Sequence, residues 1–422
     1  MKENIIAGLD IGSTAIRLVV GQKISKETGN ELQIIGAIEA PAVGIKKGVV
    51  NSIEEATSSI SACLEKAERL IGIPIQSVWA GINGLNFKCE RSRGVVAVGR
   101  SDNEITEDDV SRVIEAAQAL SVPPNYEILH VIPVKFTIDN QENIKDPIGM
   151  TGVRLEVETL IIQGLSTYVK NMTKAVYRTG LDIDDLIMSP LAAAEVVINQ
   201  KQKELGSALI NIGASTTSLA IFEEDELMHA AVLPIGSDHI TSDIAIGLRC
   251  PINLAERIKI ELGSADPEKF GKKDEMDIRE LAKEEGVEGE ISAISKKYLS
   301  EIIEARVEEI FEKVDNEFKK AERSGMLPAG VFIVGNGAKL NGLITVAKKK
   351  LRLPACIGTN KSIMTVIDKV NDPGFITALG LAVWGSKASE RYKGSAKMNW
   401  PNSSTVGKSM EKVKKWFSTL MP

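Results

Sequence analysis

Two segments about two hundred residues apart carry the same pattern of residue types, and this repeat limits the possible folds more than any other feature of the chain. One runs from Gly8 to Val20 and the other from Ile210 to Phe222. In each, an apolar strand ends at a polar tip, Asp10 or Asn211, followed by a turn of small residues and a second apolar strand. A glycine two places after the tip lets the turn fold tightly and point several backbone N–H groups at one spot, which suits a phosphate. Two ordinary β-hairpins are the alternative, but the shared order favours duplicated domains that face one cleft.

A third glycine-rich segment follows much later in the chain. A strand of the buried type, Gly330 to Val334, runs into Gly335, Asn336 and Gly337, which open a helix. At such a place the backbone can approach a flat ring or a phosphate closely. Glycine clusters after strands are common, so this segment supports a ligand cleft only together with the two hairpins.

Composition narrows the class of protein. At 422 residues with 43% hydrophobic residues, the chain can build two or more domains with real cores. The net charge of −6 argues against nucleic acid as a partner of the bulk surface. The four cysteines lack metal or redox spacing and the three histidines lie far apart, so we expect reduced structural thiols and little metal or Ser-His-Asp chemistry. No signal peptide and no membrane span are expected.

The remaining pattern is that of alternating strands and helices in mixed α/β domains. Between residues 83 and 163 the texture changes to short strands and one amphipathic helix, which predicts an inserted subdomain. The other predicted helices span residues 52–72, 166–179, 189–196, 252–263 and 297–323. In the helix at 252–263, Glu256 and Lys259 share a face, and on spacing alone they predict a solvated ion pair.

The end of the chain differs from the rest in composition and in its pattern of apolar residues. Residues 386–405 are polar and predict a flexible linker. After it, apolar residues recur at spacings of three and four with lysines beside them: Val406, Met410, Val413, Trp416, Phe417 and Leu420. A helix that docks on the globular body is one interpretation, and an interfacial membrane helix is the favoured one. Such an anchor is weak alone, so it suggests a protein that assembles on an anionic membrane surface.

Together, the hairpins, the helix with Glu256 and Lys259, the turn after Val334 and the helix at 378–382 resemble the nucleotide-binding core shared by actin, heat-shock chaperones and sugar kinases. Residues 130–133, 138–155 and 242–245 and the terminal helix resemble the bacterial cell-division family FtsA, over nearly the whole chain. The resemblance implies an α/β, two-lobed actin-like fold, a duplicated RNase H-like fold, with an inserted subdomain and a C-terminal amphipathic helix.

The resemblance also implies a division of the chain into subdomains. The first lobe would comprise residues 1–82, 164–190 and the return segment 359–385, with the inserted subdomain, residues 83–163, making protomer contacts. The second lobe would comprise a core of residues 191–240 and 301–358 and an outer subdomain of residues 241–300. The linker, residues 386–405, and the membrane-binding helix, residues 406–422, would follow.

In such a fold ATP and Mg²⁺ would occupy the cleft. Phosphate oxygens would contact one lobe through Gly12, Ser13 and Thr14, with Arg17 in the same hairpin, and the other through Gly213, Ala214, Ser215 and Thr216 beside Asn211. Asp10 would orient the metal through water. Glu256 and Lys259 would touch the ribose, and Gly335, Asn336 and Gly337 would pass beside the adenine.

The chain departs from the family pattern at several of these positions. Asn211 stands where an aspartate is usual, and Ala214, Ser215 and Asn336 stand where glycines are usual. An amide keeps the shape of a carboxylate but loses its charge, so it should bind magnesium less well and polarise water poorly. We therefore expect nucleotide binding with at most slow ATP hydrolysis.

The resemblance implies a scaffold that polymerises on the cytoplasmic face of the inner membrane, as a peripheral protein at the division site. It would tether the ring of the tubulin-like FtsZ by binding the FtsZ C-terminal tail through residues 238–297, and would recruit later divisome proteins. An actin-fold enzyme, either a phosphotransferase or an ATP-driven chaperone, is the alternative, but no carboxylate base for a substrate hydroxyl is evident. A pilus-assembly adaptor shares the core but would not be expected to carry the tail.

Overall fold

The computed structural model describes residues 5–26, 29–99, 101–119, 123–287 and 293–394. The predicted linker from residue 395 on lies outside the described residues. So does the predicted membrane-binding helix with Val406, Met410, Val413, Trp416, Phe417 and Leu420.

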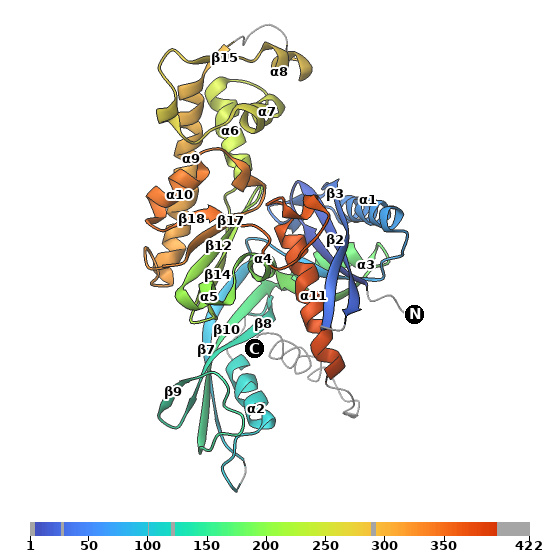
Figure 1. Cartoon of the computed structure of the whole chain (residues 1–422), viewed down its shortest axis with the longest axis vertical. Helices are drawn as coiled ribbons and strands as arrows, with labels where there is room; N and C mark the ends of the chain where they lie inside the picture. Colours follow the sequence, from blue (N-terminus) through green and yellow to red (C-terminus); the bar gives the residue numbers. More distant parts are fainter. Residues whose placement is uncertain (1–4, 27–28, 100, 120–122, 288–292, 395–422) are drawn as a thin grey trace.

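Two five-stranded sheets with the same topology form the body of the molecule (Figure 1). The first has the order β11 (Asp182–Met188), β6 (Ser77–Ile82), β1 (Ile5–Ile11), β2 (Ala15–Lys26), β3 (Gly29–Pro41). The second has the order β18 (Ala355–Ile357), β17 (Gly330–Val334), β12 (Ser207–Ile212), β13 (Thr217–Glu223), β14 (Glu226–Leu233). In each, the central strand is antiparallel to the next hairpin strand and parallel to a later one. The predicted duplication is confirmed.

Helices cover both sheets and join them. The first sheet carries α1 (Ile53–Ile71) and α3 (Ser166–Tyr177), and the second carries α9 (Lys296–Lys320) and α10 (Leu343–Leu351). Between the lobes, α4 (Ser189–Val197) packs against α11 (Ile376–Gly394), which lies on β1, β2 and β6. Short elements complete the lobes: β4 (Ile45–Lys46), β5 (Val49–Val50), α5 (Gln200–Leu205) and the 3-10 turns at Pro267–Lys269, Asn336–Lys339 and Asp368–Asn371.

Helix α1 shows how the sequence sets an element. The side chain of Ser52 accepts a hydrogen bond from the N–H of Glu55, and Gly72 ends the helix in the left-handed conformation at φ 72°. The apolar stripe that includes Ile60 and Cys63 is buried against the sheet. Both ends match the predicted range, residues 52–72, because caps are local signals, whereas Leu70 in the last turn is 65% exposed.

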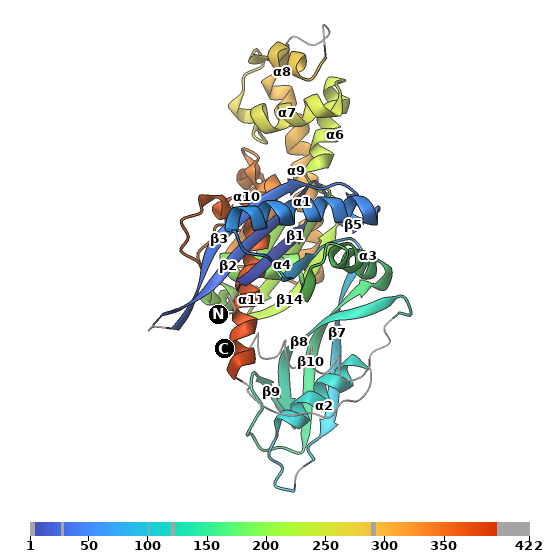
Figure 2. The ribbon, with the colours of Figure 1, turned by 90° about the vertical axis from the view of Figure 1, so that its right-hand side faces the viewer.

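Two smaller units extend from the lobes in opposite directions (Figures 1 and 2). The outer subdomain of the second lobe contains α6 (Ser237–Leu248), α7 (Ile252–Leu262), α8 (Arg279–Glu284), β15 (Glu275–Asp277) and β16 (Ala293–Ser295). The second unit, called the insert from here on, contains β7 (Phe87–Ala97), α2 (Glu107–Gln118), β8 (Tyr126–Ile138), β9 (Gln141–Ile144) and β10 (Arg154–Leu165). Its sheet order is β7, β10, β8, β9, and α2 buries one face of that sheet.

The structure differs from the sequence prediction at residues 386–394. These were expected to begin the flexible linker, but α11 continues through them to Gly394. Ser386 and Ala388 are buried, and the ammonium group of Lys387 lies 2.7 Å from the carboxylate of Glu195 on α4. Polar composition alone suggested a linker, whereas Ser386, Lys387 and Ala388 make tertiary contacts that support the helix there.

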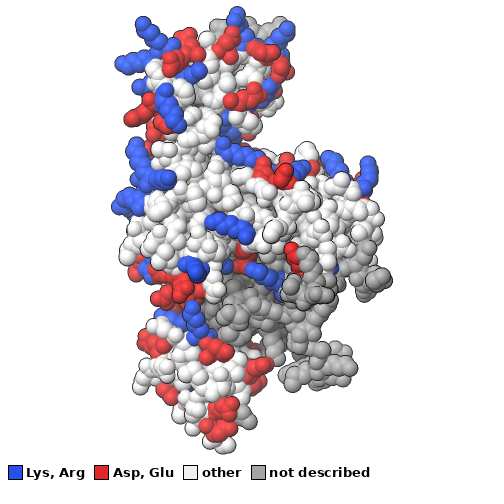
Figure 3. Space-filling view, in the orientation of Figure 1, with Lys and Arg blue, Asp and Glu red and all other residues white. Residues whose placement is uncertain are grey.

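The surface carries charges of both signs. On the face seen in Figure 3, Lys and Arg side chains are mixed with Asp and Glu side chains over the outer subdomain, whereas the lower part of the insert shows mainly Asp and Glu. Among residues 5–394, apart from the short gaps in the description, no helix is long and apolar enough to cross a bilayer.

Candidate functional site

The turns of the two hairpins have the same geometry. The N–H of Gly12 donates to the carbonyl of Ala15 at 3.0 Å, and the N–H of Gly213 donates to the carbonyl of Thr216 at 2.9 Å. Asp10 is the strand partner of Arg17 just as Asn211 is that of Ser218. The repeat seen in the sequence is therefore also a repeat in hydrogen bonding and register.

Both turns open onto one cavity of about 60 Å³ between the lobes. Twelve of the predicted site residues line it: Asp10, Gly12, Ser13, Thr14, Arg17, Asn211, Gly213, Ala214, Ser215, Thr216, Gly335 and Asn336. Three predicted residues do not line it: Glu256, Lys259 and Gly337. Five residues that the sequence analysis did not single out complete the lining: Ile11, Gly48, Asn83, Gly374 and Thr377.

These added residues connect the cavity to neighbouring elements. The N–H of Gly48, in the β4–β5 hairpin, donates to Oγ of Ser13 at 3.0 Å. Nδ2 of Asn211 donates to Oγ1 of Thr377 at 3.1 Å, which joins the second sheet to the start of α11. Asn83 follows β6 as Gly335 and Asn336 follow β17, so the sheet duplication was a signal that could have found it. No local pattern marks Thr377, which is distant from Asn211 in sequence.

Asp10 is the only carboxylate among the described residues that line the cavity. Asp10 is partly buried in the wall of the cavity, and desolvation by the surrounding protein raises its pKa to about 6, while the charge of Arg17 opposes the shift. Nε of Arg17 donates to Oε2 of Glu39 at 2.7 Å, and its guanidinium group lies 5.6 Å from the ring centroid of Phe375. A partly buried acid beside a fixed cation suits a site that receives a metal and phosphates.

The second turn is tied to the first turn of α6. The N–H groups of Ser237 and Asp238 donate to the carbonyls of Gly213 at 2.9 Å and Ala214 at 2.8 Å. Oγ of Ser215 donates to Oδ2 of Asp238 at 2.9 Å. The start of α6 therefore holds this turn in place.

Glu256 and Lys259 form an ion pair, with Nζ and Oε2 2.6 Å apart. Lys259 is 8% exposed whereas the side chain of Glu256 is 42% exposed, so the pair is buried on its lysine side and solvated only on its glutamate side. Its ammonium group also donates to Oγ1 of Thr241 at 2.8 Å and to the carbonyl of Ser237 at 3.3 Å. With three hydrogen bonds made, it holds α7 against the start of α6.

Gly335 must be a glycine. Its φ is 85°, and a Cβ there would lie 2.4 Å from Oδ1 of Asn211 and 2.4 Å from the carbonyl oxygen of Ile212. Its N–H donates to the carbonyl of Pro373 at 2.9 Å. The turn after β17 therefore lies directly against the tip of the second hairpin, which brings the third glycine-rich segment to the cavity.

Comparisons with known proteins decide the family. A model described as the SHS2 domain inserted in FtsA matches residues 84–163, and one described as cell division protein FtsA matches residues 208–380. The cell division protein FtsA of Pseudomonas aeruginosa is 33% identical over 98% of this chain and 97% of its own length. The chain belongs to the FtsA family of cell division proteins.

Solved structures show that this FtsA-family chain has an actin-like fold with an insert. A chain of a PilM–PilN type IV pilus biogenesis complex aligns with a TM-score of 0.63 at 16% identity, over 90% of this chain and 98% of that one. MreB5 of Spiroplasma citri bound to ADP aligns with a TM-score of 0.54 at 12% identity, over 93% of this chain and 99% of that one. At these identities the likeness concerns the fold alone.

The residues of this FtsA-family cleft fit phosphates and a hard cation. Hydroxyl groups and backbone N–H groups of tight turns commonly bind phosphate, and Ser13, Thr14, Ser215 and Thr216 line the cavity. Mg²⁺ is commonly held by one or two carboxylates, phosphates and waters, and Asp10 supplies one carboxylate. A cavity of about 60 Å³ holds a few waters, whereas ligand pockets usually measure about 300–1,000 Å³.

Proposed function

We infer that this chain binds ATP with Mg²⁺ in the cleft, polymerises on the cytoplasmic face of the inner membrane and tethers the FtsZ ring there as a peripheral protein. The observation that carries this proposal is the meeting of two matched turns at one cavity in a chain of the FtsA family. MreB5, which shares the fold, is bound to ADP in its structure, and this supports nucleotide as the ligand.

The proposed contacts follow the two lobes. Asp10 would orient Mg²⁺ through water, and the two turns, with Arg17 nearby, would bind phosphates. The turn from Gly335 to Gly337 would lie beside the adenine, and Glu256 and Lys259 would meet the ribose once their present hydrogen bonds rearrange. Mg²⁺ would neutralise phosphate charge, and the residues of the chain would fix the position of the triphosphate.

Hydrolysis is proposed to be slow because the second turn lacks a carboxylate base. Nδ2 of Asn211 is already committed to Thr377, and an amide cannot accept a proton from water at neutral pH. In the same turn, the hydroxyl group of Ser215 donates a hydrogen bond to the carboxylate of Asp238.

Partner contacts are proposed for three regions. Exposed apolar side chains on α6 and α7, with Ile246 76% exposed and Ile260 70% exposed, support the outer subdomain as the surface for the FtsZ tail. The insert would join protomers in a filament, and the terminal segment, residues 406–422, would bind the membrane. Later divisome proteins would join the assembled filament.

Liposome co-sedimentation tests the tether. The full chain should pellet with vesicles that contain anionic lipid, and a chain that ends at Ser404 should stay in the supernatant. Equal pelleting of the two chains would contradict the proposal. In parallel, calorimetric titration with MgATP should show binding that Asp10→Ala abolishes; no binding by the unmodified chain would reject the nucleotide site.

A further inference from the structure

The insert touches both lobes, although the chain connects it to only one of them. Both of its ends join the first lobe, through β6 before β7 and through α3 after β10. There the N–H of Leu165 donates to the carbonyl of Asn86 at 3.1 Å, beside the chain connection. Strand β14 of the second lobe contacts β7, β8 and β10 of the insert, and Figures 1 and 2 show the insert directly below β14. The attachment to the second lobe is therefore non-covalent.

The two faces of the insert sheet pack against different elements. Residues on one face, such as Leu155 and Ile161, pack under α2. Residues on the other face belong to the same apolar cluster as Leu227 and Ala230 of β14: Ile132, Val134, Leu160 and Ile162. The junction between the insert and β14 is therefore an apolar contact, like those within a domain core.

Charged groups surround this apolar contact. Nζ of Lys145, just after β9, donates to the carbonyl of Glu224 at 3.0 Å, in the turn between β13 and β14. Glu226 lies at the start of β14, where burial raises its pKa to about 7. The charged groups that face it come from the insert and from its own turn: Lys145, Lys135, Glu158 and Glu224. Its strand partner Glu223 is paired with Arg323, and Glu158 is paired with Arg91.

We propose that the contact between the insert and β14 is a latch, which separation of the two lobes releases, so that nucleotide binding changes the position of the insert. The inference rests on the proposed function, because a nucleotide must enter the cleft between the lobes. Entry requires more room than the present cavity of about 60 Å³. When the second lobe moves relative to the first, the insert cannot keep both attachments, and the non-covalent one yields first.

The ionisation of Glu226 should modulate the latch. The closed junction holds the proton of Glu226 more tightly than an open one would, because its pKa is raised only where it is buried. Closure is therefore favoured most below about pH 4.5, the ordinary value, and is weakened as the pH rises through about 7. At neutral pH the latch is poised to open.

Cys89 on β7 is partly buried and packs against the apolar cluster of the junction, so it provides a probe there. The backbone N–H of Ala230 on β14 approaches its thiol, and burial nevertheless raises the pKa of this thiol to about 12. The rate of modification by N-ethylmaleimide, with peptide mass spectrometry to assign the site, reports changes in the exposure of this thiol as the junction opens. MgATP should accelerate modification of Cys89 by about threefold or more in the full chain, and should have no effect on Asp10→Ala.

Two variants test the latch without nucleotide, both at one pH near 8 so that thiol chemistry is unchanged. Lys145→Met should accelerate modification of Cys89, because it removes the bond to Glu224. Glu226→Gln should slow it, because an amide resembles the protonated carboxyl group. Lys283→Met, on α8 of the outer subdomain, is the control and should leave the rate unchanged.

The outcomes separate the latch from the proposed function. If calorimetry shows MgATP binding but the rate at Cys89 is unaffected, the latch is wrong and the nucleotide site stands. If MgATP does not bind, both are rejected. If Lys145→Met and Glu226→Gln both react at the rate of the unmodified chain, the junction does not act as a latch.

Discussion

Asp10 is the residue on which the electrostatics of the cleft depend. Its pKa is about 6 in the folded protein against an ordinary value of 3.8, so the folded state holds this proton more tightly than the unfolded chain. The resulting stabilisation is complete below about pH 4 and is lost as the pH rises through about 6.

Replacing Asp10 should therefore change the pH dependence of the protein's stability. Without nucleotide, the melting temperature of the unmodified chain should fall between about pH 5 and pH 7.5, by about 2 °C more than that of Asp10→Asn. Asp277→Asn is the control, because Asp277 is exposed and its pKa is lowered to about 2, below the range tested. Identical pH profiles for the unmodified chain and Asp10→Asn would show that Asp10 is ionised at all these pH values.

A second prediction at the scale of single residues concerns Asn211. Asn211→Asp restores a group that can accept a proton and removes the hydrogen bond donor to Thr377. If hydrolysis is slow because the second turn lacks a base, phosphate release from MgATP by Asn211→Asp should rise about tenfold or more. A positioned base contributes about 10²–10⁴-fold. Asp10→Ala combined with Asn211→Asp should lose the gain. An unchanged rate for Asn211→Asp would place the limit elsewhere in the second turn.

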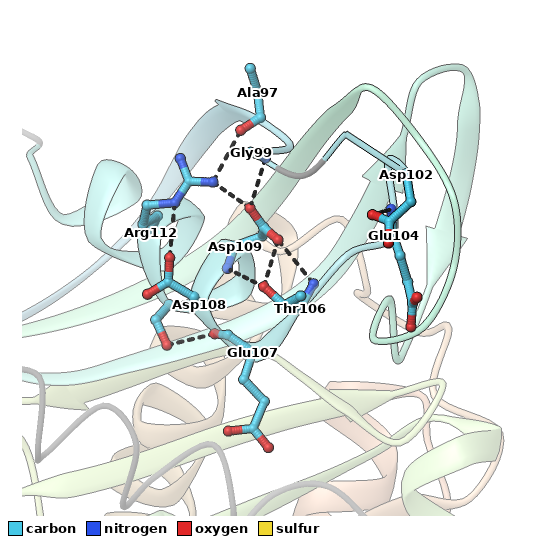
Figure 4. Close-up of polar contacts among 10 residues, drawn as sticks. Ala97, Gly99, Asp102, Glu104, Thr106, Glu107, Asp108, Asp109 and Arg112 are labelled. Atoms are coloured by element: carbon cyan, nitrogen blue, oxygen red, sulfur yellow. Dashed lines mark hydrogen bonds and ion pairs between the residues drawn. The ribbon is translucent and has the colours of Figure 1, made fainter.

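Among single elements, α2 depends on one buried acid (Figure 4). Oδ2 of Asp109 accepts from the N–H of Thr106 at 2.9 Å and from its hydroxyl at 2.7 Å, and Oδ1 accepts from Gly99 at 3.2 Å and from Arg112. Burial raises the pKa of Asp109, but these hydrogen bonds outweigh it and lower the pKa to about 2. Its stabilisation is therefore present above about pH 4 and is lost as the pH falls through about 2.

Asp109→Asn should destabilise the insert by about 1–3 kcal/mol at neutral pH, because an amide cannot accept on both sides. Hydrogen exchange should show faster opening of α2 and β7 while the two lobes keep their protection. Asp108→Asn is the matched control, because its side chain is 81% exposed and lies 3.5 Å from Arg112. Equal protection in the two variants would contradict the role assigned to Asp109.

Elements fixed by local signals were predictable from sequence, and elements fixed by distant contacts were not. Ser52 and Gly72 mark the ends of α1, and the two hairpins repeat within a dozen residues each. Nothing local shows that Lys259 turns toward Ser237, or that Thr377 meets Asn211 across the cleft. The insert was recognisable in the sequence by its short strands and single amphipathic helix, but its contact with β14 depends on how two sheets pack.

The two lobes of the whole molecule meet where α4 crosses α11. Gly380 lies at the crossing, and a Cβ there would be 2.0 Å from the carbonyl oxygen of Ala192 on α4. Both atoms belong to backbones of packed helices, so neither can turn aside as a flexible side chain would. The close packing of α4 against α11 therefore depends on the absence of a side chain at Gly380.

Gly380→Ala should lower the free energy of unfolding by about 3 kcal/mol, because the helices must separate although alanine suits a helix better than glycine. Gly247→Ala on α6 is the matched control: its Cβ would meet Cδ1 of Ile302 at 2.5 Å, the flexible end of a side chain, and stability should change little. Urea unfolding of both variants gives the comparison. Because α4 contacts strands of both sheets, surviving Gly380→Ala protein should show a wider cleft and faster modification of Cys89. Equal stability of the two variants would mean that the crossing of α4 and α11 accommodates the added methyl group and does not hold the lobes together.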